Sequence, residues 1–154
     1  MKFGFTLAAI LLATVAIVAT ATAAGPPKSA TGTDTVDTLT VTSTWQAAGN
    51  TVQEGIITGH LTGTISATYV AQFHWVLHPS GQLEAHVTGL VTGTSPCGSG
   101  TMPFRTDTSG TFAAYAGTHK GIDAADNTAN TATNLELVGS GFNLTYSGTY
   151  RCLS

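Results

Sequence analysis

The chain has 154 residues, a formal net charge of −3 at pH 7, and charged side chains at only 8% of its positions. It has no cluster of basic residues, so nucleic acids and anionic membrane surfaces are excluded as expected partners. Apolar residues make up 42% of the sequence, which is enough to form a core and argues against global disorder.

The N-terminal residues 1–24 have the features of a secretory signal peptide. Lys2 is followed by an unbroken run of apolar and small residues that ends in ATA and TAA, which suit a signal peptidase. We therefore predict a secreted, extracellular or periplasmic protein that is cleaved after Ala23 or Ala24 and then has no membrane association. An uncleaved anchor is the alternative, because the apolar run is long enough to span a bilayer.

Residues 25–37 are predicted to form a flexible leader, because they contain two prolines and few apolar residues. The folded part is expected over residues 38–154, as a single domain. It begins with TLTVTSTW at 38–45, where Leu39, Val41 and Trp45 are separated by threonines. The sequence QAAGN that follows indicates a turn.

The segment GIITGHLTGTISATYVAQFHWVLH, residues 55–78, alternates between apolar or small residues and residues with polar side chains. Successive side chains of a strand point to opposite faces, so one face is predicted to be apolar and the other polar. A single strand of this length would be unusual. We expect either a bend at Gly59 or Gly63 or a break into two strands near residues 66–69.

A hairpin is predicted between VAQFHWVLH and QLEAHVTGL, with Pro79, Ser80 and Gly81 as its three-residue turn. This turn places His74 directly opposite His86 and Trp75 opposite Ala85. A shift of the register by one residue would mix the apolar and polar faces, so the pattern itself selects this pairing.

The remaining sequence continues in short strands. Residues 97–121 predict two short strands around TDTSG, residues 121–133 a polar loop, and residues 134–152 one or two further strands. We predict an all-β fold, a single small antiparallel meander barrel of about eight strands, with a β-sandwich as the second choice. The last segment would place on one face Phe142, Leu144, Tyr146, Tyr150 and Cys152.

Cys97 and Cys152 are the two cysteines of the chain. In an exported protein two thiols usually pair, so we predict one disulfide that ties the last strand back to the middle of the chain. A redox or nucleophilic role is disfavoured, because there is no C-x-x-C sequence and neither cysteine has a neighbouring histidine.

The stretch SGTFAAYAGTHKG, residues 109–121, is typical of strands with glycine kinks, and Phe112 and Tyr115 are its candidate packing groups. It resembles a glycine-rich segment of the allene oxide cyclase-like and dirigent-like β-barrel group. The resemblance implies an eight-stranded barrel with an apolar cavity. It covers about thirteen residues and carries no catalytic residue over to this chain.

The apolar positions predict a barrel interior that either is filled by its own side chains or holds a small apolar ligand. No catalytic motif, metal site or cofactor site is indicated. His60, His74, His78 and His86 fall on the polar face, where a histidine is ordinary, and His119 is the fifth histidine. The sequence NLT at 143–145 fits an N-glycosylation site. The predicted interior consists of Ile57, Leu61, Ile65, Tyr69, Phe73, Trp75, Leu83 and Val87.

Two functions remain open from the sequence. The favoured one is a secreted, non-catalytic barrel with a binding, surface or extracellular structural role. The alternative is an isomerase or cyclase of the allene oxide cyclase-like kind, working in an apolar cavity. A polar side chain that points into the interior would favour the second, and the expected candidates are Tyr69, Tyr146 and Tyr150.

Overall fold

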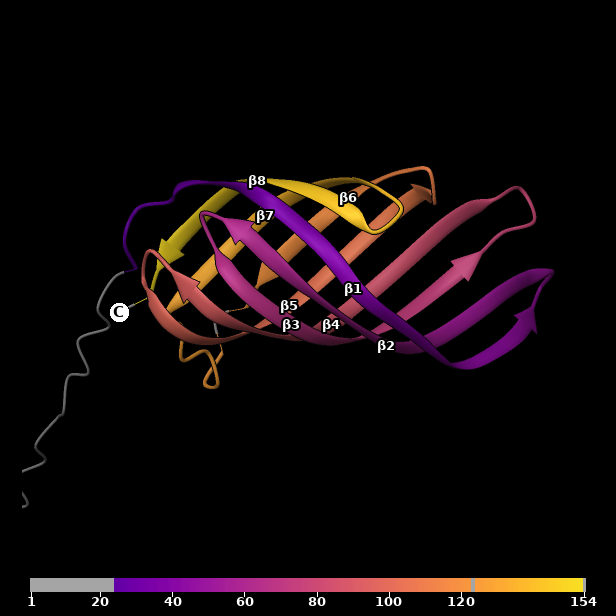
Figure 1. Ribbon diagram of the computed structural model, residues 1–154, viewed down its shortest axis with the longest axis horizontal. Coiled ribbons are helices and arrows are strands. Elements are labelled where there is room, and N and C mark those ends of the chain that lie inside the picture. The colour runs from indigo at the N-terminus through magenta and orange to yellow at the C-terminus, as the bar shows by residue number, and fades with distance from the viewer. Residues whose placement is uncertain (1–23, 123, 154) are drawn as a thin grey trace, which may run out of the picture.

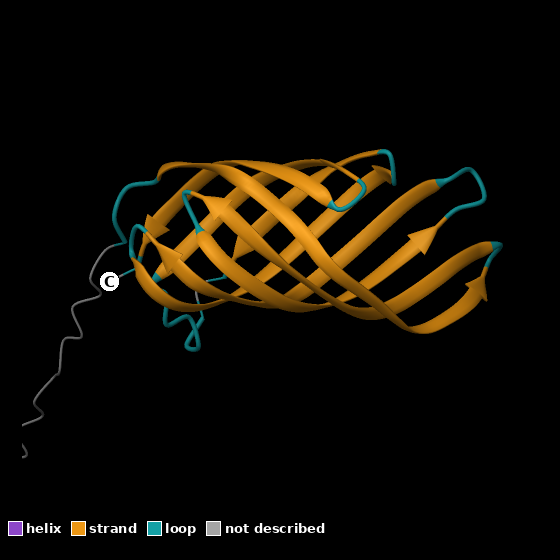
Figure 2. Ribbon diagram, in the orientation of Figure 1, coloured by secondary structure: helices purple, strands orange, loops and turns teal. Residues whose placement is uncertain are grey.

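The computed structural model describes residues 24–122 and 124–153, so the predicted signal peptide lies outside them except for Ala24. Eight antiparallel strands follow one another around a closed barrel (Figure 1), which confirms the predicted fold class. Every described element is a strand, turn or loop (Figure 2). The strands are β1 (Lys28–Ala47), β2 (Asn50–Gly63), β3 (Ser66–Leu77), β4 (Gln82–Ser95), β5 (Gly98–Thr111), β6 (Ala114–Gly121), β7 (Thr131–Ser140) and β8 (Asn143–Cys152).

The predicted flexible leader over residues 25–37 is wrong from Lys28 onward. Strand β1 begins at Lys28, and its first part, up to Thr35, pairs with β8 and closes the barrel. The inner face of this part carries small or polar residues, Ala30, Gly32 and Asp34, so it lacks the apolar alternation that marks a strand. Pairing with a strand at the far end of the chain supplies the backbone hydrogen bonds that the local sequence cannot reveal.

The segment 55–78 breaks between Gly63 and Ser66, where β2 turns into β3. The hairpin register predicted for β3 and β4 is confirmed, with His74 opposite His86 and Trp75 opposite Ala85. Its turn closes through a 2.8 Å hydrogen bond from the His78 amide to the Gln82 carbonyl, and Gly81 adopts a φ of 83°. The turn and the apolar pattern therefore agree on one register.

Residues 98–121 differ from the prediction in the position of their turn. Strand β5 runs straight through TDTSG to Thr111, and the chain reverses at Phe112 and Ala113 before β6. The stretch 109–121 is therefore the end of one strand, a turn and the next strand. The described residues that follow, 122 and 124–130, lie outside the strands.

Interior aromatic side chains lie directly across from glycines of a neighbouring strand. A Cβ atom at Gly55 or Gly59 would overlap the ring on the paired strand, so only glycine leaves room for it. This alternation of small and large residues fills a narrow barrel and explains many of the recurring glycines. The pairs are Tyr69 with Gly59, Phe73 with Gly55, Phe104 with Gly89, Tyr115 with Gly139, and Tyr146 with Gly32.

The two ends of the barrel differ. At the left of Figure 1 lie the start of β1 and the end of β8. The Cys97–Cys152 disulfide joins the end of β8 to the β4–β5 turn, which confirms the predicted bridge. At the right, the β1–β2 and β3–β4 hairpins project beyond the other strands, because β1 leaves β8 after Thr35. We call these the disulfide end and the open end.

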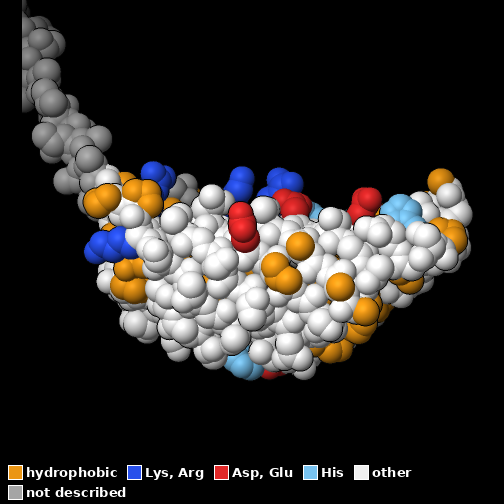
Figure 3. Space-filling view, turned by 90° about the horizontal axis from the view of Figure 1, so that it is seen from above, with side chains coloured by type: hydrophobic (Ala, Val, Ile, Leu, Met, Phe, Trp, Pro, Cys, Tyr) orange, Lys and Arg blue, Asp and Glu red, His pale blue; other side chains and the backbone are white. Residues whose placement is uncertain are grey.

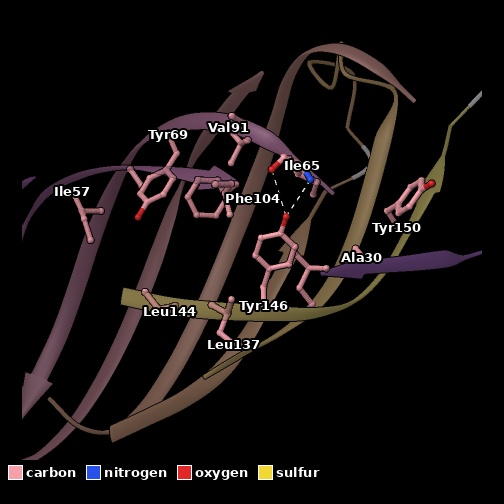
Figure 4. Close-up of a cluster of buried hydrophobic side chains, with 14 of the residues drawn as sticks. Ala30, Ile57, Ile65, Tyr69, Val91, Phe104, Leu137, Leu144, Tyr146 and Tyr150 are labelled. Carbon is pink, nitrogen blue, oxygen red and sulfur yellow. Dashed lines mark hydrogen bonds between the residues drawn. The ribbon is translucent and has the colours of Figure 1, made fainter. Parts of the chain in front are cut away.

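The core fills the disulfide end. Tyr146 packs there with Ala30 and Ile65 (Figure 4), and its hydroxyl accepts a 3.1 Å hydrogen bond from the Ile65 amide and donates one of 3.0 Å to the Thr62 carbonyl. On the face seen in Figure 3, most charged side chains lie along the upper edge, and the rest of the face is largely uncharged. Across residues 24–122 and 124–153, no helix has the length and apolar character to cross a membrane.

Candidate functional site

A cavity of about 90 Å³ lies inside the barrel towards the open end. Along the strands it extends from Asp34 and Tyr69, nearer the disulfide end, to Trp75 and Leu83, beside the β3–β4 turn. Its walls are mostly apolar. The lining consists of Asp34, Val36, Leu39, Ile57, Tyr69, Phe73, Trp75, Leu83, Ala85, Val87, Phe104, Thr106, Thr108, Phe112, Tyr115, Leu137, Gly141, Phe142 and Leu144.

Irregularities in β1 determine which of its side chains face the cavity. The register with β2 shifts between Val36 and Thr38 and again between Val41 and Ser43. A bulge inserts one residue and changes which side chains point inward. Before the first shift the inward-facing residues are even-numbered, such as Asp34 and Val36. After this shift the odd-numbered Leu39 faces inward. Asp37, at the shift, turns outward and pairs with His60 at 2.9 Å.

Among the described residues that line the cavity, Asp34 is the one that carries a charge. Its side chain is 9% exposed, and its Oδ1 atom accepts a 3.0 Å hydrogen bond from the Tyr69 hydroxyl. Within the described part of the chain this is the one hydrogen bond to its side chain, so none of these residues engages Oδ2. The carboxyl group thus has one oxygen fixed by the barrel and one left for another partner.

Burial raises the pKa of Asp34 from its ordinary value of 3.8 to about 6, although the hydrogen bond from Tyr69 acts in the opposite direction. The same burial, together with the nearby Asp34 carboxylate, raises the pKa of Tyr69 well above its usual range. Tyr69 therefore remains a neutral donor, while Asp34 is mostly ionised at neutral pH.

Hydrogen bonds also engage Tyr115, Thr106 and Nδ1 of His119, whereas Nε2 of His119 is buried without a partner among the described residues. The Tyr115 hydroxyl donates a 2.7 Å hydrogen bond to the Gly141 carbonyl, and burial raises its pKa to about 12. Thr106 Oγ1 lies 3.0 Å from Nδ1 of His119, whose ring stacks on Phe104 with 4.9 Å between the centroids. His119 is 3% exposed, and burial lowers its pKa to about 4, so it is neutral.

The eight predicted interior residues divide between two regions. Ile57, Tyr69, Phe73, Trp75, Leu83 and Val87 line the cavity. Leu61 and Ile65 are buried in the packed core at the disulfide end. Of the three tyrosines expected to point inward, Tyr69 reaches the cavity, whereas Tyr146 and Tyr150 belong to the packed core.

Sequence reasoning missed several cavity residues. Asp34 falls in the predicted leader, and Thr106 and Thr108 of β5 are not predicted to face inward. His119 of β6 is likewise not predicted to be buried, and it packs on Phe104 outside the cavity lining. A signal for β5 and β6 exists, because Met102, Phe104, Thr106 and Thr108 alternate with outward residues in the sequence. For Asp34 no local signal exists, since the bulge interrupts the alternation that begins at Leu39.

The other histidines lie on the outer face, each beside a carboxylate of a neighbouring strand. Although His74 and His86 are paired across β3 and β4, their rings contact different acids, Glu54 at 3.0 Å and Asp107 at 2.6 Å. His60 and His78 have the partners Asp37 and Glu84. The part of the chain that is described contains no group of three or more residues able to hold a metal ion.

No protein-family model matches this chain, and neither does any curated protein sequence. The chemistry of the site therefore rests on its geometry alone. An apolar cavity that opens at one end and carries a single carboxylate can hold the end of a small molecule, or it can take up and release a proton.

Proposed function

We infer that this protein is a secreted, non-catalytic β-barrel that binds one end of a small apolar ligand in the cavity at its open end. The observation that carries this inference is the cavity itself. The barrel is packed at the disulfide end, yet it keeps an open, mostly apolar space among Phe73, Trp75 and Leu83. Secretion is supported by the signal-like N-terminus and by the Cys97–Cys152 disulfide, which suits an oxidising compartment.

The size of the cavity limits what it can enclose. Its volume of about 90 Å³ is well below the several hundred Å³ of pockets that surround a whole drug-sized ligand. We therefore expect only one end of the ligand to enter. The remainder would lie at the mouth, against Phe112 and Phe142, whose rings are 5.4 Å apart and both partly exposed.

An isomerase or cyclase of the allene oxide cyclase-like kind is the alternative, and Asp34 is the observation that favours it. A carboxyl group whose pKa is about 6 in an apolar cavity suits general acid–base chemistry. Such a reaction also needs donors that stabilise developing negative charge. The Tyr69 and Tyr115 hydroxyls already donate to Asp34 and Gly141, so binding without catalysis is the better supported function.

Titration of the protein with toluene, followed by amide and indole NMR signals, tests the binding function. We expect shifts confined to the cavity lining, including the Trp75 indole. Ala85→Trp fills the cavity and should abolish these shifts, whereas the matched control Ala116→Trp, on the outer face of β6, should preserve them. Shifts spread over the outer face, or unchanged binding by folded Ala85→Trp, would contradict the proposal.

A further inference from the structure

The chemistry of the cavity also indicates which kind of ligand end it accepts. Resting on the function inferred above, we propose that the cavity selects a ligand with a cationic amine head, which Asp34 binds while the apolar remainder of the ligand occupies the mouth. Fatty acids and other apolar anions would then be rejected. Three features of the cavity support this selectivity: the charge of its lining, the geometry around Asp34, and its aromatic walls.

The described lining carries one negative charge and no positive charge. Asp34 is the one carboxylic acid among these residues, and none of them is lysine or arginine. None of the ion pairs in the described chain includes Asp34. A buried carboxylate without a counter-ion is costly, and a bound cation would supply the missing partner. A carboxylate ligand would instead place two like charges close together.

The geometry leaves one acceptor for the ligand. The Tyr69 hydroxyl occupies Oδ1 of Asp34, and no described residue donates to Oδ2. Because Tyr69 is held against Phe104, with 5.8 Å between the ring centroids (Figure 4), the carboxylate is fixed from one side. An ammonium group carries donors only, which complements this acceptor.

The walls of the cavity suit a cation as well as an apolar chain. Phe73 and Trp75 contact each other with 4.7 Å between centroids, and Tyr69 and Phe104 form a second aromatic pair. The faces of aromatic rings attract cations, most strongly when water is excluded. The aromatic lining therefore acts in the same direction as Asp34.

Three probes that share a phenyl ring test the proposal: benzylamine, benzyl alcohol and benzoate, titrated at pH 7.5 and followed by NMR. We expect benzylamine to bind at least about tenfold more tightly than benzyl alcohol, and benzoate to bind weakest. In Asp34→Asn the affinity for benzylamine should fall to the affinity for benzyl alcohol. The matched control is Asp37→Asn, which removes a negative charge from the outer face of the same strand. This variant should still bind benzylamine more tightly than benzyl alcohol.

The outcomes separate the two inferences. Equal binding of the amine and the alcohol would overturn the amine selectivity but leave the binding function intact. No binding of any probe, including toluene, would contradict the binding function itself. An unchanged preference in folded Asp34→Asn would show that another group selects the amine.

If Asp34→Asn does not fold, the pH dependence of the unmodified protein decides. Benzylamine binding should weaken severalfold between pH 7.5 and 5 as Asp34 gains its proton, while benzyl alcohol binding should not. The pKa of Tyr69, Tyr115 and Tyr146, on β3, β6 and β8, is raised by burial, and the pKa of buried His119 is lowered to about 4, so these groups do not titrate in this range. On the outer face of β1 and β2, Asp37 and His60 pair with each other. Benzylamine binding by His60→Gln should weaken with falling pH as it does in the unmodified protein. Benzylamine binding that does not change between pH 7.5 and 5 would overturn the proposal.

Discussion

At Asp34 the barrel keeps an ionisable carboxyl group in an apolar environment. In an unfolded chain this group has a pKa of 3.8, whereas burial raises it to about 6 in the fold. Between these pH values the folded protein binds more protons than the unfolded chain, so this residue lowers stability as the pH rises. The shift corresponds to about 3 kcal/mol above pH 6. A residue that lowers the stability of the fold in this way is typical of a binding or catalytic site.

The variant Asp34→Asn should therefore be more stable than the unmodified protein at pH 7.5, by about 1–3 kcal/mol in the free energy of unfolding. It retains an acceptor for the Tyr69 hydroxyl but cannot become charged. At pH 3.5 both forms are uncharged, and the difference should vanish. Urea unfolding at the two pH values measures this, and a less stable variant at pH 7.5 would show that the carboxylate supports the fold.

His119 has the opposite pH dependence. Burial lowers its pKa from 6.5 to about 4, so the unfolded chain takes up a proton first as the pH falls, and stability is lost between pH 6.5 and 4. In the unmodified protein Asp34 offsets this loss. We expect the stability of Asp34→Asn to fall by up to about 3 kcal/mol across this range, and the double variant with His119→Phe to lack this fall. Thermal melts of both variants at pH 4, 5 and 6.5 measure this. If the stability of the single and the double variant declined in parallel as the pH falls, the prediction would be wrong.

At the scale of strands, the interior is built from aromatic side chains that face glycines. Gly59 of β2 lies across from Tyr69 of β3, and an added Cβ would meet both the Tyr69 ring and the Thr35 carbonyl. The glycine therefore fixes the position of Tyr69 and, through it, the hydrogen bond to Asp34. This role differs from that of glycine in a turn, where a positive φ is needed.

Replacing Gly59 with alanine should destabilise the protein by about 1–3 kcal/mol, because the added methyl overpacks the interior. An alanine in a strand without such a contact would be neutral or stabilising. Gly25→Ala, in the segment before β1, serves as a control for the substitution itself, since nothing lies within 4 Å of a Cβ at that position. Chemical denaturation of both variants checks the prediction, and equal stability of the two would refute it.

The strands that could be predicted are those whose alternation is unbroken. Strands β2, β3 and β4 carry regular apolar faces, and the three-residue turn fixed the register between β3 and β4. Strand β1 could not be predicted in full. Its two register shifts change which residues face inward, and its first part depends on pairing with β8. Asp34 lies in that part, so the central polar residue of the site escaped sequence reasoning.

At the scale of the whole molecule, one end of the barrel is fixed and the other is open. The Cys97–Cys152 disulfide joins the β4–β5 turn to the end of β8, at the end that the core fills. The open end lacks such a bridge in the described chain, and its hairpins extend beyond the closed ring. This division leaves the cavity accessible while the packed end supports the fold.

Removal of the disulfide should therefore weaken the whole fold. The bridge closes a loop with a sequence separation of 55 residues, and the chain-entropy model assigns such a loop about 4 kcal/mol. We expect the double variant Cys97→Ala, Cys152→Ala to lose about this amount. The denatured, non-reduced protein should contain no titratable thiol, and two reactive thiols per chain would contradict the bridge.

An experimental structure determined with benzylamine at pH 7.5 tests the central claim most directly. The account predicts the ligand in the cavity, with its phenyl ring near Trp75 and Phe112 and its nitrogen within hydrogen-bonding distance of Asp34 Oδ2. A cavity closed by the protein's own side chains, with benzylamine absent or bound only to the outer face, would contradict it.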